Sequence, residues 1–325
     1  MKKERIFCLV SCLTLFVFLG MGQAQEKYPS RPIDLVAPTV PGGSSDVMAR
    51  MYSEELSQAL KVPITVVNKP GGSGSIGTAY VINSKKDGYT LLNTPSSSVI
   101  IMPLISKEVT YDPLKDLVPL GYFASIPSFF AVLPDSPFKT FGELIEYARK
   151  NPGKLKDIHA GFGTEDAFNF NIVIAKAKVQ ITQIPFQGGG EALPAALGGH
   201  GDMVTLSLST LGTHIKAGRF RALGICSLIR HPDFPNVPTL AEQGYPEANF
   251  RNWNGPFAPA GTPKHVIDIL VTAAEKALKH PDAVQRAQRL GFEVGYKSPE
   301  ELRKLIVEQI PIAEKIARDA NIYKK

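Results

Sequence analysis

Three glycine-rich loops are the segments of this chain best suited to binding chemistry, and each precedes a predicted helix. They read Gly42-Gly43-Ser44-Ser45, Gly161-Phe162-Gly163-Thr164 and Gln187-Gly188-Gly189-Gly190. A helix N-terminus presents free backbone N–H groups and the positive end of the helix dipole, glycine allows close backbone approach, and hydroxyls add neutral donors. One such loop alone is more often an ordinary helix cap. Three in one chain favour a site that holds an anion without reacting with it.

Residues for catalysis or metal binding show no recognisable arrangement. The six histidines have neither the HxxxH nor the HExxH spacing of a metal site. The chain contains no Gly-x-Ser-x-Gly nucleophile elbow and no P-loop. We therefore expect no catalytic residue, no metal site and no cofactor.

One segment matches the sequence of a cofactor-binding motif but lacks the structural context that the motif needs. Residues 72–77 read GSGSIG, the GxGxxG pattern of dinucleotide-binding folds. Asn68-Lys69-Pro70 lengthens the preceding loop, whereas a dinucleotide turn comes directly off its strand. The next strand ends at Asn93, where an NAD site needs an acidic residue for the ribose. A tight glycine-rich connection is favoured over dinucleotide binding.

Residues 1–24 have the layout of a secretory signal peptide. Basic residues precede an apolar run, Ile6–Leu19, which is shorter than the ~20 residues of a membrane span, and Gly22-Gln23-Ala24 offers small residues for cleavage. Cleavage near Ala24 predicts a periplasmic protein. The alternatives are an uncleaved anchor and a lipoprotein modified at Cys12. The lipoprotein is disfavoured because apolar sequence continues beyond that cysteine.

The composition describes a globular export product of one large or two ordinary domains. The chain has 325 residues, 44% hydrophobic and 20% charged. Without residues 1–24 the net charge falls from +6 to +4, because three basic residues and one acidic residue are lost. The sequence contains no run of five basic residues, so nothing in its charge pattern indicates nucleic-acid binding. After cleavage Cys226 is the one cysteine that remains, so no internal disulfide is possible.

Alternating strands and helices must position the loops. Strands at Ile33–Ala37, Pro63–Val67 and Tyr89–Asn93, with helices between them, predict an α/β fold with a mostly parallel sheet. Further strands are expected at Ile181–Pro185, Met203–Leu206 and Arg221–Ile225, and helix starts at Thr140, Thr262-Pro263 and Ser298-Pro299.

Nine short motifs are spread along the chain. They are Tyr28-Pro29-Ser30-Arg31-Pro32-Ile33, Pro41-Gly42-Gly43-Ser44-Ser45-Asp46, Asn68-Lys69-Pro70-Gly71-Gly72, Asp87-Gly88-Tyr89-Thr90-Leu91-Leu92, Tyr111-Asp112-Pro113, Asn151-Pro152-Gly153-Lys154-Leu155, His214-Ile215-Lys216-Ala217-Gly218, Pro235-Asn236-Val237-Pro238-Thr239 and Phe257-Ala258-Pro259-Ala260-Gly261-Thr262-Pro263. On these motifs the sequence resembles the Bug family, the TctC-like solute receptors of tripartite tricarboxylate transporters. The resemblance covers nearly all of residues 28–320, and its motifs are specific in combination although each is short.

The resemblance implies a type II-like periplasmic binding protein with two α/β domains, a ligand cleft and a two-crossing hinge. Domain 1 would comprise residues 25–128 and 251–325, and domain 2 residues 129–250. The chain would cross near Ile126–Val132 and return near Phe250–Phe257. Such a protein captures a small carboxylate and delivers it to the membrane permease subunits of a tripartite tricarboxylate transporter. A monomer that binds no nucleic acid is expected.

The resemblance also implies which residues line the cleft. Ser44, Ser45 and Asp46 match the first ligand loop of the family, and Trp253 stands where the family has an aromatic residue. Plain core packing is the alternative for Trp253. The expected ligand-binding residues are Thr39, Ser44, Ser45, Asp46, Ser97, Phe162, Gly163, Thr164, Phe186, Gln187, Gly188, Ser207 and Trp253.

Several positions depart from the family pattern. Gln187 replaces a lysine, and Leu206-Ser207 stands where many members have Asp-Asn. Thr39-Val40 replaces an aromatic residue and proline. Glu165 and Asp166 add negative charge, which disfavours a multiply charged anion unless both face solvent. We infer a ligand with one carboxylate and a less polar body, aromatic or aliphatic.

Two other functions use the same scaffold. A secreted α/β enzyme is disfavoured because no nucleophile–base or acid–base constellation occurs. A ligand sensor for a signalling receptor needs the same fold and the same cleft, so the sequence does not separate it from a transport receptor.

Overall fold

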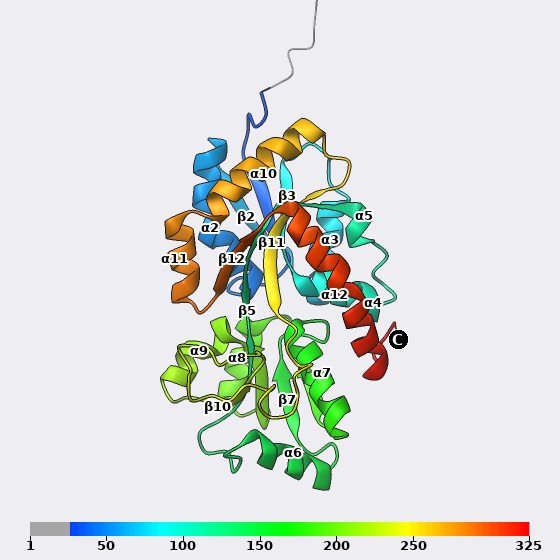
Figure 1. Cartoon of the computed structure of the whole chain (residues 1–325), viewed down its shortest axis with the longest axis vertical. Coiled ribbons are helices and arrows are strands. Elements are labelled where there is room, and N and C mark those ends of the chain that lie inside the picture. The colour runs from blue at the N-terminus through cyan, green and yellow to red at the C-terminus, as the bar shows by residue number, and fades with distance from the viewer. Residues whose placement is uncertain (1–26, 325) are drawn as a thin grey trace, which may run out of the picture.

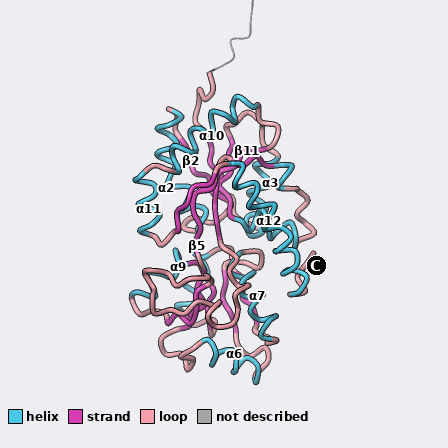
Figure 2. Tube along the Cα trace, in the orientation of Figure 1, coloured by secondary structure: helices cyan, strands magenta, loops and turns pink. Residues whose placement is uncertain are grey.

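Two β-sheets, one in each of two lobes, frame residues 27–324, the part of the chain that the computed structural model describes (Figure 1). The predicted signal peptide, residues 1–24, lies outside the described residues. We call the lobe that holds the first and last strands of the chain the upper lobe, and the other the lower lobe. Figure 2 shows the strands running down the middle of each lobe with helices on either side.

The upper lobe is built on a seven-stranded sheet of order β12-β5-β11-β3-β1-β2, with β4 beside β11. Helices of the N-terminal and C-terminal segments cover both of its faces. The strands are β1 (Ile33–Ala37), β2 (Ile64–Asn68), β3 (Thr90–Pro95), β4 (Leu117–Pro119), β5 (Tyr122–Ile126), β11 (Asn252–Pro259) and β12 (Glu293–Lys297). One face carries α2 (Ser44–Leu60), α10 (Lys264–Leu278) and α11 (Pro281–Arg289), and the other α3 (Ser75–Ile82), α4 (Met102–Ile105) and α12 (Pro299–Asp319).

Short elements complete the upper lobe. A 3₁₀ turn, η1 (Gly72–Gly74), precedes α3, a π-helical turn, η2 (Ser97–Ile101), precedes α4, and α5 (Pro113–Asp116) precedes β4. Gly77 lets α3 pack closely, because a Cβ there would lie 2.6 Å from the Lys69 carbonyl oxygen and 2.9 Å from the Pro38 Cα. The glycine-rich segment 72–77 is therefore a tight connection in this fold.

The lower lobe is built on a five-stranded sheet of order β10-β6-β9-β7-β8. Its strands are β6 (Ser128–Val132), β7 (Lys156–His159), β8 (Thr182–Pro185), β9 (Met203–Ser207) and β10 (Arg221–Ile225). Its helices are α6 (Phe141–Lys150), α7 (Glu165–Ala177), α8 (Gly189–Leu197) and α9 (Leu208–Lys216).

The chain joins the lobes twice. Only Pro127 separates β5 of the upper lobe from β6 of the lower lobe. Residues 226–251 lead back from β10 to β11, and the Asn169 side chain holds this return by donating to the Phe250 carbonyl at 2.8 Å and accepting from its N–H at 2.9 Å. Two crossings between the same pair of lobes suit a hinge.

Both sheets are mixed rather than mostly parallel. β1 pairs in parallel with β2 and β3, and β7 with β8 and β9, as the alternating βα pattern predicts. The strands next to the crossings run the other way: β11 is antiparallel to β3 and β5, and β6 is antiparallel to β9 and β10. The prediction of a mostly parallel sheet is wrong because the chain leaves and re-enters each sheet through these strands.

Local signals predict most helix starts correctly. The capping boxes at Thr140–Glu143 and Ser298–Glu301 are both present. The exception is Thr262, whose hydroxyl donates to the Pro259 carbonyl at 2.8 Å, so that Pro263 becomes the N-cap of α10. Within residues 27–324, no helix is both long enough and apolar enough to cross a membrane.

Candidate functional site

A small cavity of about 60 Å³ lies between the lobes, and both contribute to its wall. The upper lobe supplies the loops after β1, β2 and β3, and the lower lobe supplies the starts of α7, α8 and α9. The lining residues are Pro38, Thr39, Gly43, Ser44, Ser45, Gly71, Ser73, Gly74, Pro95, Ser97, Ala160, Thr164, Glu165, Asp166, Gln187, Gly188, Gly189, Leu206, Ser207, Thr210 and Asn252.

The three glycine-rich loops meet at this cavity. Gly43 and Gly188 are the N-caps of α2 and α8, and neither provides a side-chain acceptor for the first turn of its helix. Thr164 caps α7 by accepting from the Ala167 N–H at 3.3 Å. Two helix starts therefore direct backbone donors and positive dipole ends toward the space between the lobes.

Buried hydrogen bonds fix the first loop to the sheet behind it. The Ser45 hydroxyl donates to Asn254 Oδ1 at 2.6 Å, and Asn93 Nδ2 donates to the Ser45 carbonyl at 2.7 Å. The Ser44 hydroxyl accepts from Asn252 Nδ2 at 3.2 Å. The Ser45 proton is thus used inside the protein, and this serine positions the loop, whereas the Ser44 proton stays free to donate to a ligand.

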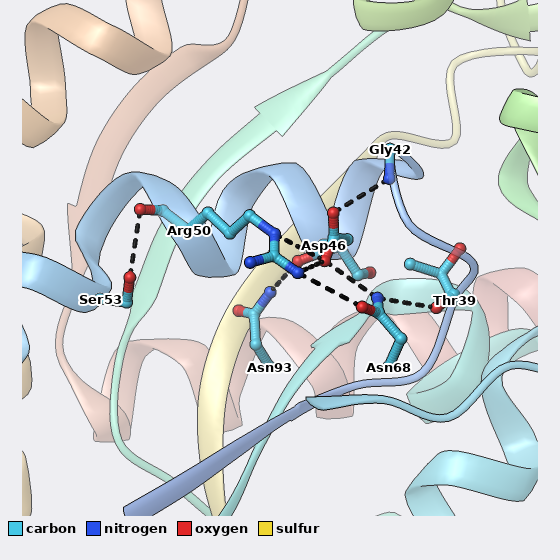
Figure 3. A network of polar contacts seen from close by, with 8 residues as sticks. Thr39, Gly42, Asp46, Arg50, Ser53, Asn68 and Asn93 are labelled. Carbon is cyan, nitrogen blue, oxygen red and sulfur yellow. Dashed lines mark hydrogen bonds and ion pairs between the residues drawn. The ribbon is translucent and has the colours of Figure 1, made fainter. Parts of the chain in front are cut away.

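Asp46 is the centre of a polar network that anchors the same loop (Figure 3). Its carboxylate accepts from the Gly42 N–H at 3.0 Å, from Arg50 Nε at 3.0 Å and from Asn68 Nδ2 at 2.9 Å. Asn68 Nδ2 also donates to the Thr39 carbonyl at 3.0 Å. Burial alone would raise the pKa of Asp46, but the hydrogen bonds from Arg50, Gly42 and Asn68 outweigh it and lower the pKa.

Replacing Asp46 tests this anchoring role. Asp46→Ala removes the acceptor of several donors, so we expect the free energy of unfolding to fall by about 2 kcal/mol at neutral pH. Because the folded-state pKa is lowered, this contribution is complete above the usual aspartate pKa of about 3.9 and disappears as the pH falls below it. Urea unfolding at neutral and acidic pH measures it.

Asp268→Ala is the matched control. Asp268 is exposed on α10, where it pairs with Lys264, so its removal should cost less than about 0.5 kcal/mol. Equal losses in the two variants would contradict the anchoring role of Asp46.

Glu165 and Asp166 do not face solvent. Glu165 is 1% exposed and Asp166 is 4% exposed, and both line the cavity. Burial raises the pKa of Glu165 to about 7 and that of Asp166 to about 6, against the lowering effect of hydrogen bonds from Ser96 and Ser128. A multiply charged anion was expected to be tolerated only if both acidic residues faced solvent, and they do not.

A second, larger groove opens from the cavity. It encloses about 680 Å³ and shares Ser73, Ala160 and Gln187 with the cavity wall. Its lining mixes apolar and polar side chains and includes one exposed basic and one exposed acidic residue. The lining residues are Gly72, Ser73, Met102, Ile105, Ser106, Lys107, Glu108, Ala160, Gly161, Phe162, Gly163, Pro185, Phe186 and Gln187.

The expected ligand-binding residues fall into four places. Thr39, Ser44, Ser45, Ser97, Thr164, Gln187, Gly188 and Ser207 line the cavity, and Phe162, Gly163, Phe186 and again Gln187 line the groove. Asp46 lies behind the first loop. Trp253 is 1% exposed in the core, where its indole N–H donates to Gln309 Oε1 at 2.9 Å. This position matches the core-packing alternative for Trp253.

Sequence reasoning missed several residues of the cavity wall. Ser73 and Gly74 belong to the GxGxxG segment, whose glycines and serine could have indicated a loop near a ligand as well as a dinucleotide motif. Asn252 and Thr210 carry no local signal. They reach the cavity because β11 returns beside β3 and because α9 begins directly after β9.

One group of potential metal ligands lies away from the cavity. Glu55, His280 and Asp282 bring three ligand atoms within 4.8 Å of one another. Arg286 already donates to Glu55, and His280 Nδ1 accepts from the Asp282 N–H at 3.3 Å. Because Glu55 already pairs with a cation and one imidazole nitrogen of His280 is already used, the group does not suit a metal ion. It is better described as the N-cap of α11 together with an ion pair.

Known proteins show the same architecture. The model of the tripartite tricarboxylate transporter family receptor (TctC) matches residues 48–322. A protein from the tcbD–tcbE intergenic region of Pseudomonas sp. strain P51 is 36% identical over 87% of this chain and 84% of its own length. The periplasmic binding protein BugD is 31% identical, with a TM-score of 0.86 over 92% of this chain and all of the BugD chain.

A further solved structure includes a bound acid. Rpa4515 of R. palustris, solved with adipate, is 27% identical, with a TM-score of 0.86 over 92% of this chain and all of its own. The resemblance to the Bug family and the type II-like periplasmic binding protein fold are thereby confirmed. The chain belongs to the TctC family of tripartite tricarboxylate transporter receptors, which are periplasmic solute-binding proteins.

Proposed function

We propose that this chain is an extracytoplasmic receptor that closes over a small carboxylate and delivers it to the membrane permease of a tripartite transporter. The observation that carries the proposal is the cavity between the lobes, toward which helix starts from both lobes direct backbone donors. Such neutral donors hold an anion that must later be released. The solved relative with adipate supports a carboxylate as the ligand.

The protein would work as a hinged pair of domains in the periplasm. Residues 25–128 with 251–325 would form domain 1 and residues 129–250 domain 2, with the ligand shifting an existing equilibrium toward the closed form. Residues 1–24 would direct export and be removed near Ala24. The receptor would act as a monomer, without a cofactor and without catalysis.

The ligand would have one carboxylate in the cavity and an apolar body in the groove. The cavity, at about 60 Å³, is much smaller than the groove, at about 680 Å³, so the compact charged group belongs in the cavity. The rest of the ligand must continue into the groove, where Met102, Phe162 and Phe186 offer apolar surface. An aliphatic or aromatic acid of low charge fits this division.

Thermal unfolding with a panel of acids tests the proposal. Butyrate, hexanoate, benzoate, succinate and adipate are compared with butyramide and benzamide, which keep the body but lack the charge. A true ligand at 100-fold excess over its Kd adds about 2.7 kcal/mol to the free energy of unfolding, whereas the amides should add almost nothing. If no acid raised the melting temperature, or amides acted equally, the carboxylate assignment would be wrong.

A further inference from the structure

Glu165 lies where it can influence which acids the cleft accepts, an inference that rests on the proposed function. It is the first residue of α7 in the lower lobe. Its Oε1 accepts from the Ser96 hydroxyl and from the Ser97 backbone N–H, and both of these belong to the upper lobe. A carboxylate of the protein thus already bridges the two lobes.

The donors that Glu165 occupies are of the kind that would otherwise hold a ligand. Ser96 and Ser97 follow β3 and begin the η2–α4 segment, and Ser97 lines the cavity. A backbone N–H and a hydroxyl at the start of a helical segment form a typical anion site. Because Glu165 fills it, a ligand carboxylate must use the remaining donors near α2 and α8.

Asp166 differs from its neighbour in this respect. It accepts from the Ser128 hydroxyl and from the Ser207 N–H, both in the lower lobe. Its charge also borders the cavity, but it takes no donor from the opposite lobe. Glu165 therefore makes a contact between the lobes, whereas Asp166 makes its contacts within the lower lobe.

The charge of the cavity wall points the same way. Among the described residues that line it, Glu165 and Asp166 are acidic, and there is no lysine, arginine or histidine. One ligand carboxylate can be held by neutral donors, as in other helix-start sites. A second one in the same small space would meet two buried acidic groups and no cation. The nearest basic side chain in either lining is Lys107, out at the rim of the groove.

We propose that Glu165 acts as an internal carboxylate that excludes ligands with two neighbouring carboxylates from the cleft. It does so by occupying the Ser96 and Ser97 donors and by repelling a second negative charge. Short dicarboxylates such as succinate, and aromatic diacids such as phthalate, are the excluded class. Acids with one terminal carboxylate are accepted, and a distant second charge can lie in the groove.

Matched pairs of acids test the inference by calorimetry. Butyrate is compared with succinate, and benzoate with phthalate, at about pH 8, above the pKa of Glu165 of about 7. The wild type should bind each monoacid at least about tenfold more tightly than its diacid. Glu165→Gln removes the charge and should reduce this preference about tenfold. Glu165→Ala also frees the Ser97 N–H and should reduce it further.

Glu143→Gln is the control. Glu143 lies in the first turn of α6 like Glu165 in α7, but it is exposed and outside the linings of the cavity and the groove. This variant should keep the wild-type preference. If the Glu165 variants acted only by disturbing the structure, they would weaken the binding of both acids of a pair equally and leave the ratio of the two affinities unchanged. Circular dichroism and melting curves of each variant check for such a disturbance.

Two failures are distinguishable. If acids bind but the wild type accepts succinate and phthalate as well as their monoacids, or the ratio stays constant in both Glu165 variants, the inference is wrong and the proposed function stands. If none of the four acids, nor any other in the thermal panel, binds to any variant, the proposed function fails as well.

Discussion

Gly163→Val is expected to weaken ligand binding about 100-fold while leaving each lobe folded. A Cβ at Gly163 would lie 2.0 Å from Met102 Sδ and 3.0 Å from Ser73 Cβ, and both of these residues belong to the upper lobe. The Gly163 N–H also donates to the Ser73 hydroxyl at 3.1 Å across the same gap. A branched side chain here needs the space that Met102 and Ser73 occupy, and we expect the lobes to separate to provide it. If the closed form falls to about 1% of molecules, the apparent Kd rises about 100-fold.

Calorimetry with the best acid of the thermal panel measures this loss, and small-angle scattering measures the opening. The free energy of unfolding should change by less than about 1 kcal/mol, because the obstructing atoms lie in the other lobe. Gly142→Val is the control, since a Cβ there meets only Thr140 Oγ1, at 3.9 Å. Unchanged affinity in Gly163→Val would show that the lobes need not meet at Gly163 for binding.

The sequence predicted those parts of the site that have local causes. The glycine-rich loops at Gly43, Thr164 and Gly188 precede helices because glycine and hydroxyl residues favour helix starts. Their position beside strands then brings them to one edge of each sheet. The family motifs added the two-lobed fold, which places these edges face to face.

Contacts between distant segments could not be predicted in the same way. Glu165 reaches Ser96 across 69 residues of sequence, and nothing local indicates that this acid is buried rather than solvated. Ser45 donates to Asn254 because β11 returns antiparallel to β3. An α/β pattern predicts parallel neighbours, so both the returning strand and its polar contacts escaped prediction.

The pH dependence of stability should change when Glu165 becomes glutamine. Burial raises the pKa of Glu165 in the folded protein to about 7, from 4.5 in an unfolded chain. Between these values the folded state binds more protons than the unfolded state, so this group lowers stability as the pH rises. The difference corresponds to roughly 3 kcal/mol, which is fully expressed above about pH 7 and absent below about pH 4.5.

Urea unfolding from about pH 4.5 to 8 compares the wild type with Glu165→Gln, in which this proton linkage is absent. We expect the two proteins to be similar near pH 4.5 and the variant to gain on the wild type up to about pH 7. Asp166, whose folded pKa of about 6 is also raised, remains in both proteins, and because its charge helps to raise the pKa of Glu165, the difference includes this coupling. A parallel curve for Glu165→Gln would mean that Glu165 titrates normally and is not held as a buried carboxyl between the lobes.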